Sequence, residues 1–117
     1  MAKAKVVINE QHSLMEDQYR ALREQGFSEI EFVKIPKDGL TKEEQMKLAE
    51  ELKEEGSIVF ASPVPVLMAQ LAFWAGAGYG TDKIYVLHND KREKRELPNG
   101  NIVSVVAKEG WELVPIR

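Results

Sequence analysis

The stretch from Ser57 to Asp90 constrains the fold more strongly than any other part of the chain. It contains a short apolar run at 58–61, an almost entirely apolar segment at 63–74 and a second short run at 84–87. The short runs are rich in β-branched residues and too short for helices, so they predict buried parallel strands. Ser62 is followed by a proline, and this pair favours a helix whose N-cap is Ser62.

The predicted helix at 63–74 has a single polar residue in its body, Gln70. A helix that is apolar on all sides is either enclosed by its own domain or covered by a partner subunit. A chain of 117 residues has difficulty enclosing such a helix completely, so we expect a homodimer that forms through the Val64–Trp74 helix. The alternative is a helix that is simply well buried in a monomer. A membrane span is not expected, because it takes about 20 apolar residues.

Apolar runs and amphipathic segments also alternate before this stretch. Strands are predicted at 6–8 and 30–35, and capping-box patterns that begin at Ser13 and Thr41 each predict the start of a helix. The resulting order, β-α-β-α-β-α-β, predicts a mostly parallel, Rossmann-like sheet with helices on both faces, because crossovers between parallel strands are right-handed. We expect residues 1–117 to form a single α/β domain.

After Asp90 the pattern changes. The run at 91–96 alternates in charge, which favours a solvated surface loop. An Asn-Gly pair at 99–100 predicts a tight hairpin turn. Apolar residues at 102–106 and 111–116 predict short antiparallel strands, which would form a C-terminal hairpin or meander that extends or caps the sheet.

Composition and motif spacing exclude several classes of function. The chain has no cysteine, which excludes disulfides and thiolate ligands, and its two histidines are too far apart in sequence to predict a metal site. The formal net charge of −3 argues against duplex nucleic acid as a partner. Glycines at 76, 78 and 80 depart from the G-x-G-x-x-G dinucleotide fingerprint and predict a helix cap and turn. No apolar signal segment follows Met1, so we expect a cytoplasmic protein.

The loops after the first, third and fourth predicted strands should meet at the carboxyl edge of the sheet, where open α/β sheets bind ligands. They carry the candidate site residues Asn9, Gln11, His12, Ser62, His88, Asn89, Lys91 and Arg92. Pro63 and Pro65 remove backbone N–H donors from the predicted helix start, so basic side chains rather than amides would hold a phosphate there. The alternative for each of these residues is an ordinary structural role, such as an Asn-Asp turn at 89–90.

Two segments carry a resemblance that extends over most of the chain: INEQHSLMEDQ from Ile8, and, in the stretch from Ser57 onward, SPVPVLMAQLAFWAG leading into HNDKREKRELPNG. Together with the predicted layout, they resemble the small stand-alone ring nucleases of type III CRISPR systems, which have a CARF-like Rossmann fold. The resemblance implies a homodimer that binds cyclic oligoadenylate, often cyclic tetra-adenylate, across its two-fold axis. It also implies cleavage to linear products without a metal ion or cofactor, which switches off CRISPR signalling.

The implied reaction is attack of a ribose 2′-hydroxyl on its own 3′-phosphate, which requires in-line geometry and stabilisation of charge. By their loop positions, Lys91 and Arg92 would neutralise phosphate charge, and His12 or His88 would move the proton. The remaining candidates would bind the ligand, chiefly at ribose or adenine edges: Asn9, Gln11, Ser62 and Asn89. Two other functions stay open, namely a sensor or sponge that binds a cyclic nucleotide without cleaving it, and a structural homodimer without a ligand.

Overall fold

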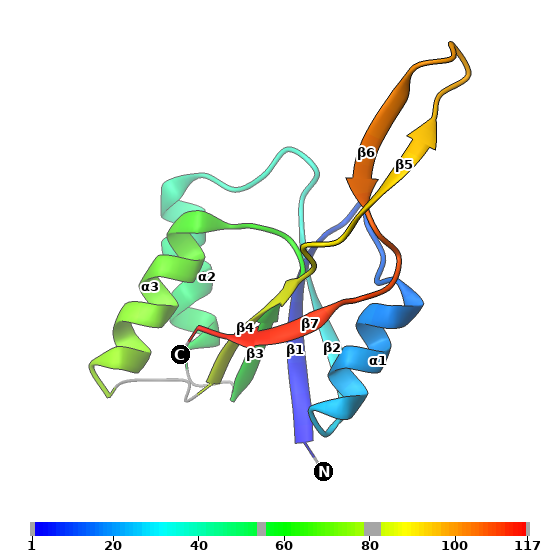
Figure 1. Cartoon of the computed structure of the whole chain (residues 1–117). Coiled ribbons are helices and arrows are strands. Elements are labelled where there is room, and N and C mark those ends of the chain that lie inside the picture. The colour runs from blue at the N-terminus through cyan, green and yellow to red at the C-terminus, as the bar shows by residue number, and fades with distance from the viewer. Residues whose placement is uncertain (1, 54–55, 79–82, 117) are drawn as a thin grey trace.

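The computed structural model describes residues 2–53, 56–78 and 83–116, and its central element is a five-stranded sheet in the order β2-β1-β3-β4-β7 (Figure 1). Four strands are parallel: β1 (Ala2–Asn9), β2 (Phe27–Ile35), β3 (Ser57–Phe60) and β4 (Lys83–His88). The edge strand β7 (Glu112–Pro115) pairs antiparallel with β4. The helices are α1 (Glu16–Glu24), α2 (Lys42–Leu52) and α3 (Pro65–Gly76). The predicted α/β fold with a mostly parallel, Rossmann-like sheet is confirmed.

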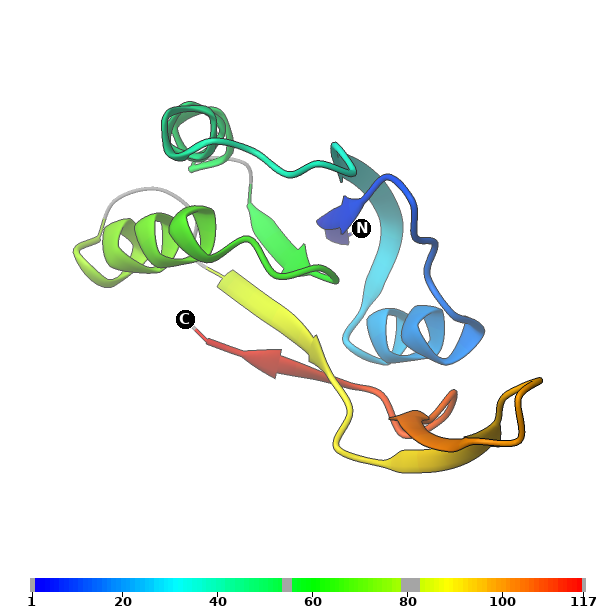
Figure 2. The same ribbon diagram turned by 90° about the horizontal axis from the view of Figure 1, so that it is seen from above.

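Helices cover both faces of this sheet, with α2 and α3 on one side and α1 on the other (Figure 2). Successive strand residues point to opposite faces, so each central strand contributes to two separate cores. The core under α2 and α3 includes Val7, Ile58, Phe60 and Ile84. The core under α1 includes Val6, Ile8, Val59 and Tyr85. This double burial explains why the predicted strands are continuous apolar runs instead of alternating ones.

The two predicted capping boxes have different outcomes. At the start of α2, Thr41 Oγ1 accepts the Glu44 N–H at 3.1 Å and Glu44 Oε1 accepts the Thr41 N–H at 2.8 Å, as predicted. The prediction at Ser13 is wrong, because α1 begins at Glu16 and its N-cap is Met15. There the Met15 N–H donates to Gln18 Oε1 at 2.7 Å. Gln18 thus takes the part that the capping-box pattern at Ser13 gave to Glu16.

The start and the surroundings of α3 also differ from the prediction. Ser62 is not the N-cap, because Val64 occupies that position and Pro65 is the first helical residue. The helix buries Leu67 and Leu71 completely, but Phe73 is 69% exposed, so α3 has a solvent-facing side in the single chain. Beyond the helix, Gly78 adopts a φ of +84°, as a turn glycine should, whereas residue 80 lies outside the described residues. Within the described ranges, no helix combines the length and apolar character needed to cross a bilayer.

The chain after β4 forms a ribbon of two antiparallel strands, β5 (Arg92–Glu96) and β6 (Ile102–Val106), which projects away from the helices (Figure 1). The charged run is therefore a strand and not the predicted loop, because β6 supplies backbone partners for it. The predicted turn is confirmed, with the Leu97 N–H donating to the Asn101 carbonyl at 2.7 Å. The predicted C-terminal antiparallel hairpin is confirmed as β5–β6. The alternative, a meander, does not form, because β6 and β7 belong to different sheets, and β7 extends the main sheet.

Candidate functional site

The carboxyl ends of β1 and β3 lie side by side and are joined by Asn9 and Ser62. The Asn9 N–H donates to Ser62 Oγ at 2.9 Å, which explains why this hydroxyl does not cap α3. Asn9 then shapes the next loop, because its Oδ1 accepts the Gln11 N–H at 2.9 Å and its carbonyl accepts the His12 N–H at 2.9 Å. The result is a tight turn that holds the exposed His12 beside the sheet edge.

A hollow of about 450 Å³ opens beside this turn, and we call it the His12 hollow. Its polar lining comes from Gln11, His12, Ser13, Gln18 and Ser62, and its apolar lining includes Met15, Val106 and Trp111. The volume falls in the range of small-ligand pockets, ~300–1,000 Å³. The lining combines an imidazole that can move protons, hydroxyl and amide groups that can bind sugar or phosphate oxygens, and an indole on which a base can stack.

Trp111 reaches the hollow because α1 holds its backbone. Asp17 Oδ2 accepts the Gly110 and Trp111 N–H groups, both at 2.9 Å, and Arg20 Nη2 donates to the Trp111 carbonyl at 2.8 Å. Arg20 also pairs with Asp17 through two bonds, of 2.6 and 3.1 Å. The Arg20 guanidinium and the Trp111 and Gly110 amides hold the pKa of Asp17 well below its usual range. Asp17 and Arg20 therefore fix the backbone of Trp111 beside the hollow.

The indole nitrogen of Trp111 is the one buried side-chain polar atom without a hydrogen-bond partner among the described residues. Trp111, Asp17 and Arg20 were not among the residues predicted from sequence. An Asp-x-x-Arg spacing on a helix is typical of an ordinary surface ion pair. Nothing local indicates that its acceptor and donor groups bind a segment 91–94 residues further along the chain.

Asn89 has a structural position. Its side chain is 7% exposed, and its Nδ2 donates to the Ala107 and Glu109 carbonyls at 3.0 and 2.9 Å. Its Oδ1 accepts the Lys91 N–H at 3.0 Å. Both N–H groups of the amide are thus occupied, and Asn89 ties the end of β4 to the loop that leads from the ribbon to Trp111.

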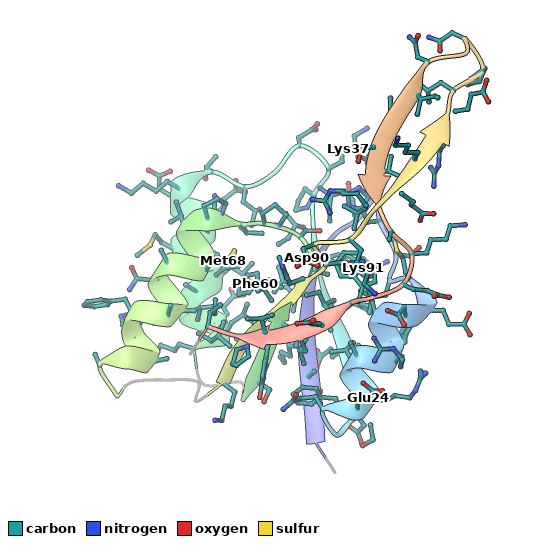
Figure 3. The ribbon with its side chains drawn as sticks, viewed as in Figure 1. Glu24, Lys37, Phe60, Met68, Asp90 and Lys91 are labelled. Carbon is teal, nitrogen blue, oxygen red and sulfur yellow. The ribbon has the colours of Figure 1, made fainter. Side chains whose placement is uncertain are left out.

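The remaining predicted residues of this loop lie apart from the His12 hollow. His88 is exposed at the end of β4, in register with Glu112 of β7. Lys91, labelled in Figure 3, lines a second hollow of about 380 Å³, which shares Trp111 with the first. Arg92 Nη1 folds back onto the carbonyls of its own loop at 3.1 and 3.2 Å. The structure therefore brings Gln11, His12 and Ser62 together and separates them from the predicted cations.

Asn9 lines a third hollow, of about 330 Å³, at the start of α3. Pro63 and Pro65 border it, and Gln45 Oε1 accepts the Leu67 N–H at 3.1 Å. A backbone amide that could have bound an anion is therefore already occupied. This agrees with the expectation that a phosphate would not be held by amides at this helix start.

Within residues 2–53, 56–78 and 83–116, no group of three or more His, Asp or Glu side chains is arranged to hold a metal ion. No protein-family model, curated protein or solved structure matches this chain.

Proposed function

We propose that this protein is a cytoplasmic ring nuclease, which binds a cyclic oligoadenylate and cuts it to linear products to switch off type III CRISPR signalling. Cyclic tetra-adenylate is the first substrate to test. The observation that carries the proposal is the His12 hollow, where an imidazole, a buried serine hydroxyl and an indole meet at the carboxyl edge of the sheet. That edge is where ligands of open α/β sheets bind.

In the proposed reaction, the ribose 2′-oxygen forms a bond to the adjacent phosphorus and the bond from phosphorus to the 5′-oxygen breaks. His12 accepts the proton of the attacking 2′-hydroxyl, and the departing 5′-oxygen takes up a proton. The products are a 2′,3′-cyclic phosphate and a 5′-hydroxyl, so the step needs no cofactor. Gln11 and Ser62 would orient the ribose, and Trp111 would stack an adenine.

Phosphate charge would be neutralised next to the His12 hollow. Lys91 and Trp111 both line the second hollow, and Trp111 also lines the His12 hollow. A cyclic oligoadenylate that extends past the indole would therefore approach the Lys91 ammonium. We assign charge stabilisation to Lys91. We assign proton transfer to His12 and not to His88, because His12 lines the hollow. Asn9 supports Ser62 through its backbone, and Arg92 contributes positive charge to the same loop.

The proposal includes a homodimer through α3, as the sequence resemblance implies. Pro65, Ala69 and Phe73 are spaced four residues apart and all are exposed, so they form an apolar stripe on one side of the helix. A variant that tests this contact is Phe73→Lys, because Phe73 is 69% exposed and its replacement leaves the buried Leu71 untouched. The expected result is that Phe73→Lys sediments at half the mass of the parent assembly.

The activity is tested with radiolabelled cyclic oligoadenylates of several ring sizes, in the presence and absence of a chelator. His12→Ala should slow cleavage by ~10²–10⁴-fold with little effect on binding. His88→Ala is the matched control, since this histidine does not line the His12 hollow, and it should cleave like the parent. Lys91→Ala should weaken binding roughly tenfold or more, because it removes a charge-assisted phosphate contact.

Three other outcomes would contradict the proposal. Tight binding without cleavage would identify a sensor or sponge. Failure of every ring to bind would leave a structural homodimer. Cleavage that a chelator abolishes and a divalent ion restores would refute the metal-independent step.

A further inference from the structure

The β5–β6 ribbon is a two-stranded sheet that stands apart from the main sheet. Such a ribbon is at best marginally stable alone in water, and three or more strands are normally needed. Ile102 is 67% exposed and Val106 37% exposed, so apolar side chains of β6 remain uncovered in the single chain. A further strand would therefore stabilise the ribbon, and the exposed apolar side chains of β6 provide a surface for it.

The two outer edges of the ribbon differ in their side chains. Strand β5 consists of five consecutive charged residues, and natural sheets use charge to protect exposed edges from pairing. Strand β6 reads Ile-Val-Ser-Val-Val and carries no charge. An uncharged, β-branched edge is the type that accepts another strand.

The backbone of β6 is oriented for such pairing. The Leu97 N–H donates to the Asn101 carbonyl, and the Ala107 N–H donates to the Lys91 carbonyl, so the odd-numbered residues of the two strands form the hydrogen-bonded pairs. In an antiparallel ladder the intervening residues direct their N–H and C=O groups outward. On β6 these outward residues are Ile102, Ser104 and Val106.

We infer that two copies of this chain pair antiparallel through the outer edges of β6 and form a continuous four-stranded sheet. The second copy is the occupant that the sequence of β6 favours, because the strand is complementary to itself about Ser104. In that register Ile102 lies opposite Val106 of the second copy, and Val103 lies opposite its Val105. Every cross-strand pair then joins two aliphatic side chains or two hydroxyls, which are stabilising combinations.

This pairing does not depend on the proposed cleavage, but it would bring the second copy to the same site. Val106 is the last residue of β6 and lines the His12 hollow. In the register centred on Ser104, the hairpin turn of the second copy lies beside Ala107 and Lys108. Each copy would therefore border the hollow of the other, which makes the hollow part of the interface.

A cysteine cross-link tests the register directly, because the chain has no native cysteine. Two residues that exchange hydrogen bonds across an antiparallel pair have Cα atoms about 5.5 Å apart, which suits a disulfide. Ser104→Cys, oxidised mildly at low micromolar concentration, should run mainly as a dimer on a non-reducing gel. Lys94→Cys is the matched control, since Lys94 lies directly opposite Ser104 on β5 and on the other edge, and it should stay monomeric.

A proline pair provides an independent measurement by sedimentation. Ser104→Pro removes an outward N–H without disturbing the bonds to β5, and should halve the mass of the parent assembly. Lys94→Pro makes the same change on the charged edge and should leave the mass unchanged. Phe73→Lys reports separately on α3, so loss of either contact can be distinguished from loss of cleavage.

The inference is overturned if Ser104→Cys does not cross-link, or if Lys94→Cys cross-links equally well. It is also overturned if only Phe73→Lys lowers the mass of the assembly. A parent protein that is monomeric at every concentration, or that binds a strand of a different protein at β6, would be equally decisive against self-pairing.

Discussion

The central sheet and the β5–β6 ribbon contain similar β-branched strands but bury them very differently. In the sheet, Val6, Val7 and Ile58 are 0% exposed, because helices cover both faces. In the ribbon, Ile102 is 67% exposed. Its strand, Ile-Val-Ser-Val-Val, is nevertheless as β-branched as the buried strands of the sheet. The comparison shows that β-branched character predicts a strand, whereas burial depends on which helices or partner strands reach it. The strands of the sheet are buried within a single chain. The stability of the ribbon depends on the hydrogen bonds at its base and on a partner strand at its outer edge.

The largest expected effect tests this difference with the same substitution in each region. Ile58→Ala removes a fully buried side chain and should cost ~2–5 kcal/mol of unfolding free energy. Ile102→Ala should stay within ~0.5 kcal/mol in the isolated chain, as exposed substitutions do. Chemical denaturation at low protein concentration measures both values.

Repeating this measurement at high concentration sharpens the comparison. If a second copy covers β6, the cost of Ile102→Ala should grow with concentration, while that of Ile58→Ala should not. Equal costs for the two variants at low concentration would show that the ribbon is as buried as the sheet.

A smaller effect is expected where the two regions join. Asn89→Ala leaves the carbonyls of Ala107 and Glu109 and the Lys91 N–H without their partner, which should cost about 1–3 kcal/mol. Hydrogen exchange should speed up in the 107–111 loop before it does so in the sheet. Asn99→Ala, in the exposed turn, is the matched control and should change stability much less. An Asn89→Ala protein as stable as the parent would mean that the ribbon base is not held by this amide.

The smallest effect is expected in the pH dependence of stability, through the contact that Asp17 of α1 makes with Gly110 and Trp111. The pKa of Asp17 is lowered in the folded state, chiefly by its hydrogen bonds to Arg20 and then to the Trp111 amide. A lowered folded-state pKa contributes stability above the unfolded value, near 4, and that contribution is lost as the pH falls toward the folded value. The parent should therefore lose stability below about pH 4 faster than Asp17→Asn, measured by denaturation across pH. Glu24→Gln, which changes a more exposed partner of Arg20, should keep the pH profile of the parent.

Two capping patterns show how far local sequence carries. The boxes at Ser13 and Thr41 have the same spacing, but only Thr41 caps a helix. Near Ser13, Leu14 packs into the core under α1, and Gln18 binds the Met15 N–H in place of the serine box. The Ser13 hydroxyl and the Gln18 side chain could each accept a backbone N–H near the start of α1. The local pattern therefore does not determine where the helix begins, and core packing does.

The candidate site divides in the same way. Asn9, Gln11, His12 and Ser62 were predicted to meet because parallel strands bring their carboxyl ends to one edge of the sheet, and their contacts agree with this. Trp111 could not be predicted as part of the site, since it arrives through bonds from Asp17 and Arg20 on α1. Asn89 was expected to face a ligand, but partners 18 and 20 residues away occupy its amide.

The sequence by itself determined the order of strands and helices as far as β4, the parallel sheet and the edge where its loops gather. Apolar periodicity, turn residues and the handedness of crossovers act over short range, so they are visible in the order of residues alone. Tertiary structure alone decided that the charged run pairs with β6, that β7 returns to β4, and that Lys91 and His12 line different hollows. These outcomes depend on hydrogen bonds and packing between segments far apart in the chain, for which local patterns carry no signal.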